Sequence, residues 1–215
     1  SLFLVPNTLD NGTPNGVSTM RIEEKLGLHA SPTCSLVFED AVGYLIGPEG
    51  RGLPTLFIMI ESMRLGVAVQ GAAVAQAAAA VAENYAADRK QGGPPDQPPV
   101  AITEHAEVQR LLLSSRIRAE AARLIALETA SAVDAGSAGD DMAKERARIL
   151  LPLAKSFGAD AAFANASTAI QVLGGAGYVK DWPAERMLRD CRIFSIYEGT
   201  TAIQGLDLLQ RRVLG

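Results

Sequence analysis

Three stretches of the chain, each about 35 residues long, carry a helical pattern of apolar residues, which is far above the usual helix length. The pattern predicts helices over residues 53–90, 102–135 and 140–173, with shorter ones over 183–190 and 200–213. Long helices joined by short loops pack as antiparallel neighbours. The sequence therefore predicts a mainly α fold, an up-and-down four-helix bundle.

The composition indicates what holds these helices together. Hydrophobic residues make up 48% of the chain and aromatic residues only 5%, so the core must be built from Ala, Leu, Ile and Val. Small side chains favour closely packed helices. The longest apolar run, Leu65 to Ala82, is mostly alanine and contains Gln70 and Gln76. We interpret it as a buried helix of a soluble protein rather than a membrane span.

The first 52 residues have a different character. The runs "LFLV", "VSTMRIEE" and "CSLVFED", at residues 2–5, 17–24 and 34–40, are typical of strands, and turn residues such as "NGTPNG" separate them. A few strands alone cannot bury two faces of a sheet. We therefore expect two domains, residues 1–52 as the end of a β domain whose other strands lie outside this chain, and residues 53–215 as the helical bundle.

Charge and cysteine usage disfavour several classes of protein. The net charge is −4 and the pI is near 5.3 without a Lys/Arg block, so binding to nucleic acid is not expected. Cys34 and Cys191 are interpreted as buried free thiols in a cytoplasmic protein. With only His29 and His105 and no Cys/His cluster, no metal site is predicted. His105 is interpreted as structural.

The stretch "QVLGGAGYVKDWPAERMLRDCRIFSIYEGTTAIQ" resembles the C-terminal signature of the acyl-CoA dehydrogenase family. The resemblance extends upstream through "EEKLGLHASPTCSLVFED" and "MRLGVAVQG", and the "IQGLDL" ending is similar to the longer branch, which includes enzymes acting on 3-methylmercaptopropionyl-CoA. It implies an acyl-CoA substrate, FAD as cofactor, electron-transfer flavoprotein as electron acceptor, and a homodimer or homotetramer. Because much of the flavin site would lie outside this chain, we expect these residues alone to be inactive and to bind FAD poorly.

The resemblance implies that Glu198 is the catalytic base. Members of the family remove the α-proton of an acyl-CoA thioester while a hydride leaves the β-carbon, and a weakly acidic proton needs a base placed against it. Some members carry the base just before the arginine that Arg64 matches, but Met63 stands there and cannot accept a proton. Glu61 lies on another face of that helix. Local sequence alone favours a helix-entry acid that interacts with the helix dipole, and the surrounding motif turns the interpretation of Glu198 to catalysis.

The remaining site residues also come from the resemblance, and most of them have a structural alternative. Arg89 could be a helix-end partner of the dipole, Gly174 and Gly175 a turn after a helix C-cap, and Thr200 an N-cap. Arg64 could form an ion pair, and Tyr197 could pack in the core. The residues implied to contact FAD are Arg89, Gln171, Gly174, Gly175 and Thr200, and those implied to contact the substrate are Arg64, Tyr197 and Gly199.

Three other functions remain open at this level. An acyl-CoA oxidase shares the fold and the base but returns electrons to O₂. A non-catalytic helical scaffold is disfavoured by the presence of Glu198. A DNA-associated relative would require a basic surface, which this composition lacks.

Overall fold

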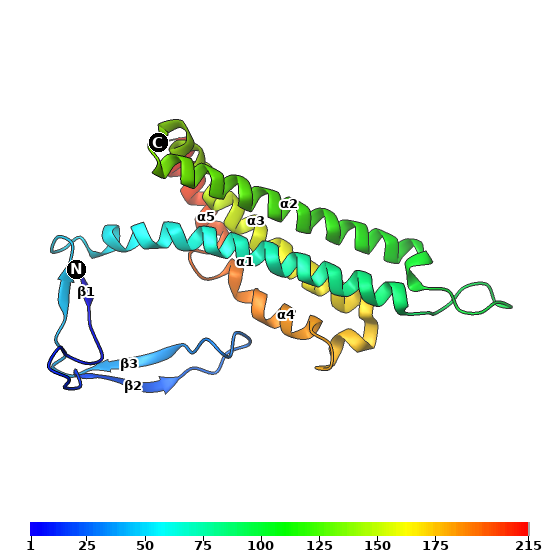
Figure 1. Cartoon of the computed structure of the whole chain (residues 1–215), viewed down its shortest axis with the longest axis horizontal. Coiled ribbons are helices and arrows are strands. Elements are labelled where there is room, and N and C mark those ends of the chain that lie inside the picture. The colour runs from blue at the N-terminus through cyan, green and yellow to red at the C-terminus, as the bar shows by residue number, and fades with distance from the viewer. Residues whose placement is uncertain (215) are drawn as a thin grey trace. The chain divides into compact units, whose positions relative to one another are not determined.

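The computed structural model of the protein describes residues 1–214, without the side chains of residues 211–213. The chain is mainly helical with a few strands near its N-terminus, as predicted, and it divides into two compact units, Ser1–Ser62 and Met63–Gly215 (Figure 1). The predicted domain boundary near residue 52 stays a prediction. The elements are β1 (Leu2–Leu4), β2 (Val17–Ile22), β3 (Cys34–Phe38), β4 (Tyr44–Ile46), α1 (Gly52–Asp88), η1 (Ile102–Glu104), α2 (Ala106–Ser137), α3 (Asp141–Leu173), η2 (Gly174–Tyr178), α4 (Ala184–Cys191), η3 (Arg192–Ser195), α5 (Thr201–Asp207) and the π-helical turn η4 (Leu208–Val213).

The first unit contains two antiparallel strand pairs, β1 with β4 and β2 with β3. The three predicted strands are present, although each is shorter than its apolar run. The short strand β4 was not predicted, because "YLI" is too brief to show an alternating pattern. Apolar side chains on β2 and β3, including Met20 and Phe38, are exposed in this chain. That further strands complete the sheet stays a prediction.

Asn15, in the turn sequence "NGTPNG", organises the loops of the first unit. Its side-chain amide donates to the carbonyl oxygens of Pro6 and Val42, each at 2.8 Å. Its side-chain oxygen accepts from the backbone N–H groups of Gly16 and Val42. Asn15 is buried, so these bonds satisfy an amide that would otherwise be costly to bury.

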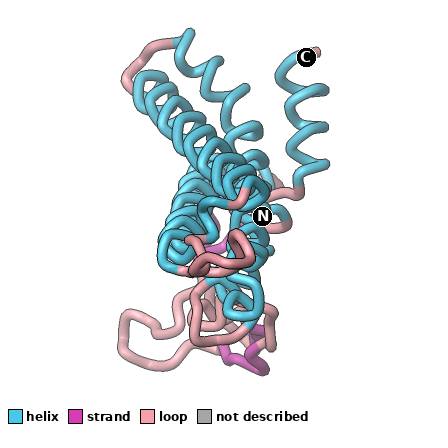
Figure 2. The backbone as a smooth tube through the Cα atoms, turned by 90° about the vertical axis from the view of Figure 1, so that its right-hand side faces the viewer, coloured by secondary structure: helices cyan, strands magenta, loops and turns pink. Residues whose placement is uncertain are grey.

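The core of the second unit consists mainly of alanine, one of the four residue types that the composition predicted, whereas Leu113, Ile117 and Leu124 are exposed. The buried contacts between α1, α2 and α3 are made largely by alanine, and the helices run alongside one another over many turns (Figures 1 and 2). Alanine side chains let helix backbones approach closely. One core cluster comprises Ala72, Ala75, Ala79, Ala119, Ala122 and Ala161, and a second comprises Ala68, Ala126 and Ala154.

Two of the long helices approach each other closely at Gly71 of α1 and Gly158 of α3. A Cβ atom added to Gly71 would lie 2.3 Å from the Gly158 carbonyl carbon, so the backbones touch at this point. Asn165 of α3 ties the three helices together nearby, because its amide donates to the carbonyl oxygens of Ala75 in α1 and Ser115 in α2.

The ends of the long helices follow recognisable local chemistry. Asp140 caps α3, since its carboxylate accepts from the backbone N–H of Ala143 at 3.0 Å. The proline-rich segment after α1 is a loop, as predicted, and His105 contacts the Gln91 carbonyl oxygen through Nε2 at 2.7 Å. That contact fits the structural interpretation of His105.

Cys191 is buried as predicted, whereas Cys34 is only half-buried, and both are free thiols.

The C-terminal segment is helical, but the face that it buries is not the predicted one. The apolar spacing of Ile203, Leu206, Leu209 and Val213 predicted an apolar inner face. In α5 and η4 the first three of these are about half exposed, whereas Gln204 and Asp207 are buried. The final helix packs against α3, as predicted, but the apolar residues that motivated the prediction are not those that it buries, because polar partners inside the bundle attract the opposite face; the side chain of Val213 lies outside the described residues.

Within the described residues, α1 is the one helix that is long and apolar enough to cross a membrane by length and composition. The core helix of a soluble protein passes the same test, and the alanines of α1 pack into the bundle. The helix is therefore weak evidence for a membrane span.

Candidate active site

The connection between α4 and α5 places Glu198 in an unusual backbone conformation. Glu198 has φ +54° and Gly199 has φ +93°, and Thr200 then begins α5 as its N-cap. A residue other than glycine pays roughly 1–2 kcal/mol to adopt the left-handed region. The surroundings must therefore hold the turn from which the half-buried Glu198 projects.

Two buried donors hold the backbone of this turn. The side-chain amide of Gln204 donates to the carbonyl oxygen of Glu198 at 2.9 Å and approaches that of Gly199 at 3.4 Å. The ammonium of Lys155, from the middle of α3, donates to the Gly199 carbonyl oxygen at 2.6 Å. A Cβ at residue 199 would lie 2.5 Å from the Gln204 amide nitrogen. The positive φ therefore favours glycine at this position, and a Cβ would in addition displace the end of the Gln204 side chain.

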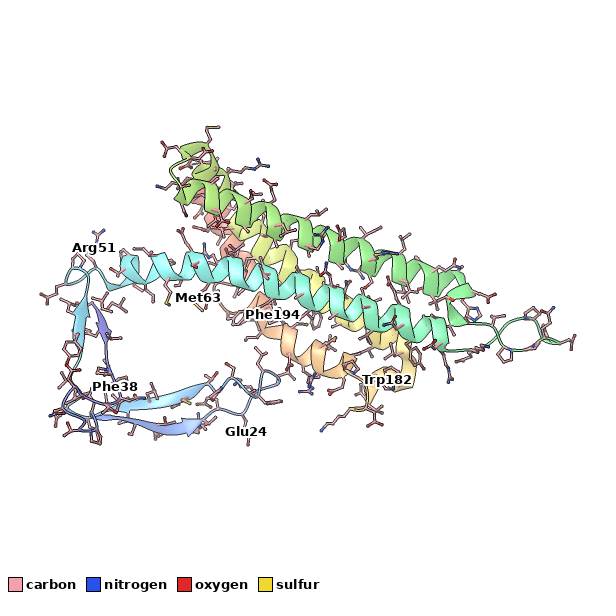
Figure 3. All side chains as sticks on the ribbon, viewed as in Figure 1. Glu24, Phe38, Arg51, Met63, Trp182 and Phe194 are labelled. Carbon is pink, nitrogen blue, oxygen red and sulfur yellow. The ribbon has the colours of Figure 1, made fainter. Side chains whose placement is uncertain are left out.

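The aromatic residue before the glutamate is fixed from two sides. The Tyr197 ring stacks on Phe194 with 5.9 Å between ring centroids, and its hydroxyl donates to the Gln70 side-chain oxygen at 2.5 Å. Figure 3 labels Phe194 just beyond α4. Burial, together with the negative charge of Glu198, raises the pKa of Tyr197 to about 12. Tyr197 is therefore a neutral hydrogen-bond donor in this site.

Arg64 forms a buried ion pair with α5. Its guanidinium lies 3.1 Å from an Asp207 carboxylate oxygen, and both side chains are buried. An ion pair to another helix was the structural alternative for Arg64, and it is present in this chain. The predicted contact of Arg64 with the acyl-CoA stays a prediction.

Lys155 lies in the same polar cluster, which we call the polar joint: Arg64, Lys155, Gln204 and Asp207. Burial lowers the pKa of Lys155, and the neighbouring Arg64 charge lowers it further, while Asp160 and Glu198 oppose the shift. The polar joint thus contains two cations and one carboxylate, with the Glu198 carboxylate near enough to interact electrostatically with Lys155.

The other predicted cofactor residues lie at the far end of the long helices. Gly174, with φ +60°, ends α3 as a C-cap whose N–H donates to the Gln171 carbonyl oxygen. Arg89 follows α1 and lines a groove of about 410 Å³ together with Tyr85 and Trp182, whose rings meet edge to face. Figure 3 labels Trp182 beside that end of α1.

The two groups of predicted residues are therefore separate within one chain. Gln70, the partner of Tyr197, precedes Arg89 along α1, and a rise of 1.5 Å per residue puts them about 28 Å apart. The structure brings Glu198, Gly199, Thr200, Tyr197 and Arg64 together at one site. The Gln171–Gly175 segment and Arg89 lie far along the bundle from it.

Comparison with known proteins identifies the family. The model of the acyl-CoA dehydrogenase C-terminal domain matches residues 50–214. The chain belongs to the acyl-CoA dehydrogenase family. It is 40% identical to 3-methylmercaptopropionyl-CoA dehydrogenase of Ruegeria pomeroyi over the whole chain, which spans 38% of that relative's length.

Solved acyl-CoA dehydrogenases share the fold. Caenorhabditis elegans ACDH-11, in complex with C11-CoA, superimposes with a TM-score of 0.89 at 27% identity, over 98% of this chain and 35% of that one. Butyryl-CoA dehydrogenase from Megasphaera elsdenii superimposes with a TM-score of 0.78 at 30% identity, over 93% of this chain and 49% of that one. The chain thus corresponds to less than half of either protein.

Members of the acyl-CoA dehydrogenase family use FAD, and the exposed residues at the far end suit its phosphates. Gly174 and Gly175 are exposed, and a Cβ at either would meet nothing within 4 Å, so a ligand can approach the backbone there. The exposed Arg89 guanidinium makes one long bond, 3.4 Å, to Gln91. Arginine is well suited to a pyrophosphate, so these residues fit that part of the cofactor.

Sequence reasoning missed three members of the polar joint, Lys155, Gln204 and Asp207. Lys155 could have been recognised, because it lies one helical turn from Leu151 and from Ala159 on the apolar stripe of α3. A lysine on a buried stripe needs a partner. Gln204 and Asp207 carried no comparable signal, since polar residues in a short terminal helix are usually solvated.

Proposed function

We propose that this chain is the catalytic C-terminal part of an FAD-dependent acyl-CoA dehydrogenase, in which Glu198 is the base. The observation that carries the proposal is the Glu198 turn itself. The half-buried residue Glu198 is held in the left-handed backbone region, between Tyr197 and the N-cap of α5, in a chain of this family. Strained backbone that its neighbours hold in place is typical of active sites.

The proposed reaction oxidises the bond between the α- and β-carbons of the acyl thioester. Glu198 takes the α-proton, and the electron pair of the broken C–H bond becomes the second bond between the two carbons. FAD, when bound, accepts the hydride that leaves the β-carbon. The Glu198 backbone N–H is suited to donate to the thioester oxygen as negative charge develops there. Tyr197 and Gly199 would line the acyl site, and Thr200 would contact the flavin.

The separation of the two groups of residues supports an oligomer. Glu198 and Thr200 would serve one FAD molecule. Arg89, about 28 Å from Gln70 along α1, would hold the ADP and pyrophosphate part of an FAD bound mainly by a second copy, together with Gln171, Gly174 and Gly175. A homodimer or homotetramer would provide both contacts at each site. Arg64 would act near the substrate while it remains paired with Asp207.

The electrons would pass to an electron-transfer flavoprotein in the cytoplasm. An oxidase would instead release peroxide, so a dehydrogenase and an oxidase are separated by comparing anaerobic turnover with such an acceptor against peroxide formation in air.

The chain alone should bind FAD poorly and be inactive; purification of these 215 residues as a yellow protein with stoichiometric flavin would contradict this expectation.

The test is anaerobic flavin reduction by acyl-CoA in the full-length enzyme that contains this chain. Glu198→Gln keeps the size of the side chain but removes its basicity. FAD should remain bound while the reduction rate falls at or beyond the upper end of the roughly 10²–10⁴-fold range that a positioned base contributes.

Glu61→Gln is the matched control, because it makes the same chemical change at an exposed glutamate of α1, on a different face of that helix from Met63. It should lose far less activity than Glu198→Gln. If Glu198→Gln retained flavin reduction within about fivefold, well below the range for a general base, the base would lie elsewhere and the proposed role of Glu198 would be wrong.

A further inference from the structure

Lys155 is the largest fully buried side chain among the described residues, and lysine is almost never fully buried without a partner. It comes from the middle of α3, where small and apolar residues face the core on either side. Burying an ammonium group is costly unless hydrogen bonds and opposite charge compensate. Lys155 therefore needs an explanation that the packing of the bundle does not supply.

The ammonium is directed at the backbone of the Glu198 turn. Its bond to the Gly199 carbonyl oxygen measures 2.6 Å, and the Gln204 amide reaches the same oxygen at 3.4 Å. A hydrogen bond from a charged donor is roughly twice as strong as one between neutral groups. The shorter, charged bond is the main restraint on the Gly199 peptide, and Gly199 is the residue that follows the strained φ of Glu198.

The charges around Lys155 agree with a role at this turn. Arg64 on α1 repels the ammonium, and Asp160 on α3 and Glu198 attract it. Asp207 on α5 pairs with Arg64 and so offsets that repulsion. Of the two carboxylates that attract Lys155, only Glu198 belongs to the turn whose backbone the ammonium holds.

We propose that Lys155 is a positioning residue for Glu198: by holding the Gly199 carbonyl, its ammonium fixes the left-handed turn and thereby the direction of the carboxylate. This inference rests on the proposed function of Glu198. A methionine of similar length would fill the same space without an ammonium to bury. The ammonium therefore carries a desolvation cost that a methionine would not. The lysine is thus explained by the restraint that it places on the turn.

The first experiment compares Lys155→Met with Lys144→Met in the FAD-loaded, full-length enzyme. Lys144 is the matched control, an exposed lysine on the same helix. Lys155→Met should lower kcat for acyl-CoA-dependent flavin reduction by about 10- to 100-fold, the effect of a misplaced catalytic group. KM and the FAD content should change little. Lys144→Met should match the wild type.

Two further readouts separate positioning from general stability. A crystal structure of Lys155→Met should show that Glu198 has left the left-handed region or that the Gly199 peptide has rotated. Lys155→Gln, which keeps a neutral donor, should recover part of the rate, and it replaces Lys155→Met if that variant does not fold.

The deciding experiment is a double-mutant cycle. If Lys155 acts only through Glu198, the double variant Lys155→Met/Glu198→Gln should be no slower than Glu198→Gln alone. Losses that multiply, or a Lys155→Met rate within about twofold of the wild type, would overturn the inference. An active Glu198→Gln single variant would instead refute the proposed function, while the turn geometry in the Lys155→Met crystal structure would still report whether Lys155 holds Gly199.

Discussion

The middle of the bundle and the polar joint beside Glu198 fill the buried space between helices with opposite kinds of side chain. Between α1, α2 and α3 the buried side chains are mostly alanine, and two glycines bring helix backbones into contact. Beside Glu198, the residues that α5 buries are polar: Asp207 pairs with the Arg64 guanidinium, and Gln204 shares the Gly199 carbonyl oxygen with the Lys155 ammonium. The first region gains stability from close packing, and the second gains a defined backbone geometry.

The difference has a physical reason. Alanine contacts are non-directional, so they bring helices close but do not orient a particular carbonyl group. Buried ionic groups are weak contributors to stability, because desolvation offsets their attraction, but their hydrogen bonds are directional. A carboxylate in a strained turn requires the directional kind of support. The comparison therefore predicts that overpacking destabilises the alanine core, whereas an unpaired charge destabilises the polar joint.

The largest loss of stability is expected from Asp207→Leu. This variant leaves the Arg64 guanidinium buried without the carboxylate 3.1 Å from it, and breaking a buried pair costs about 3–5 kcal/mol. The double variant Arg64→Met/Asp207→Leu should regain most of that loss, because no charge is then left unpaired. Denaturant unfolding of the enzyme measures both. A double variant as unstable as the single one would show that the pair itself supplies net stability.

A smaller loss is expected from Gly71→Ala in the alanine core. The added methyl would lie 2.3 Å from the Gly158 backbone, and such overpacking costs about 1–3 kcal/mol. Gly66→Ala on the same helix is the matched control, because its Cβ would meet nothing within 4 Å. It should increase stability by about 0.4–1 kcal/mol. Equal effects at the two glycines in thermal unfolding would contradict the close approach of α1 and α3.

The smallest effect concerns the titration of Tyr197. Its pKa is raised from an ordinary value of 10.0 to about 12, so the folded state disfavours the phenolate. The corresponding contribution to stability is complete below about pH 10 and is lost as the pH rises through about 12. The ultraviolet difference spectrum between the wild type and Tyr197→Phe should therefore show a phenol that ionises near pH 12. A midpoint near pH 10 would mean that Tyr197 is solvated.

The sequence predicted the positions of the helices well and the polar joint poorly. Helix positions follow from local periodicity and composition, which act over a few residues. The burial of Gln204 and Asp207 depends on Lys155 and Arg64, which lie far away in the chain. Apolar spacing in the last helix pointed to the wrong face, since periodicity registers hydrophobic side chains but not buried polar partners.

In the candidate site, too, some features could be predicted from the sequence and others depend on tertiary structure. Glu198, Gly199 and Thr200 could be named because the surrounding stretch resembles a family signature, but the positive φ of Glu198 was not predictable from that resemblance. Whether Arg64 contacts substrate also depends on tertiary structure, because the sequence allowed an ion pair and the structure contains one.

The most direct test of the role of Glu198 is a crystal structure of the full-length enzyme with FAD and an acyl-CoA that cannot react. We expect one Glu198 carboxylate oxygen to lie roughly 3–3.5 Å from the substrate α-carbon, the separation of reacting atoms before transfer. Glu198 should keep its positive φ, with the Lys155 ammonium on the Gly199 carbonyl. A different carboxylate against the α-carbon, or a Glu198 side chain directed away from it, would contradict the assignment of the base.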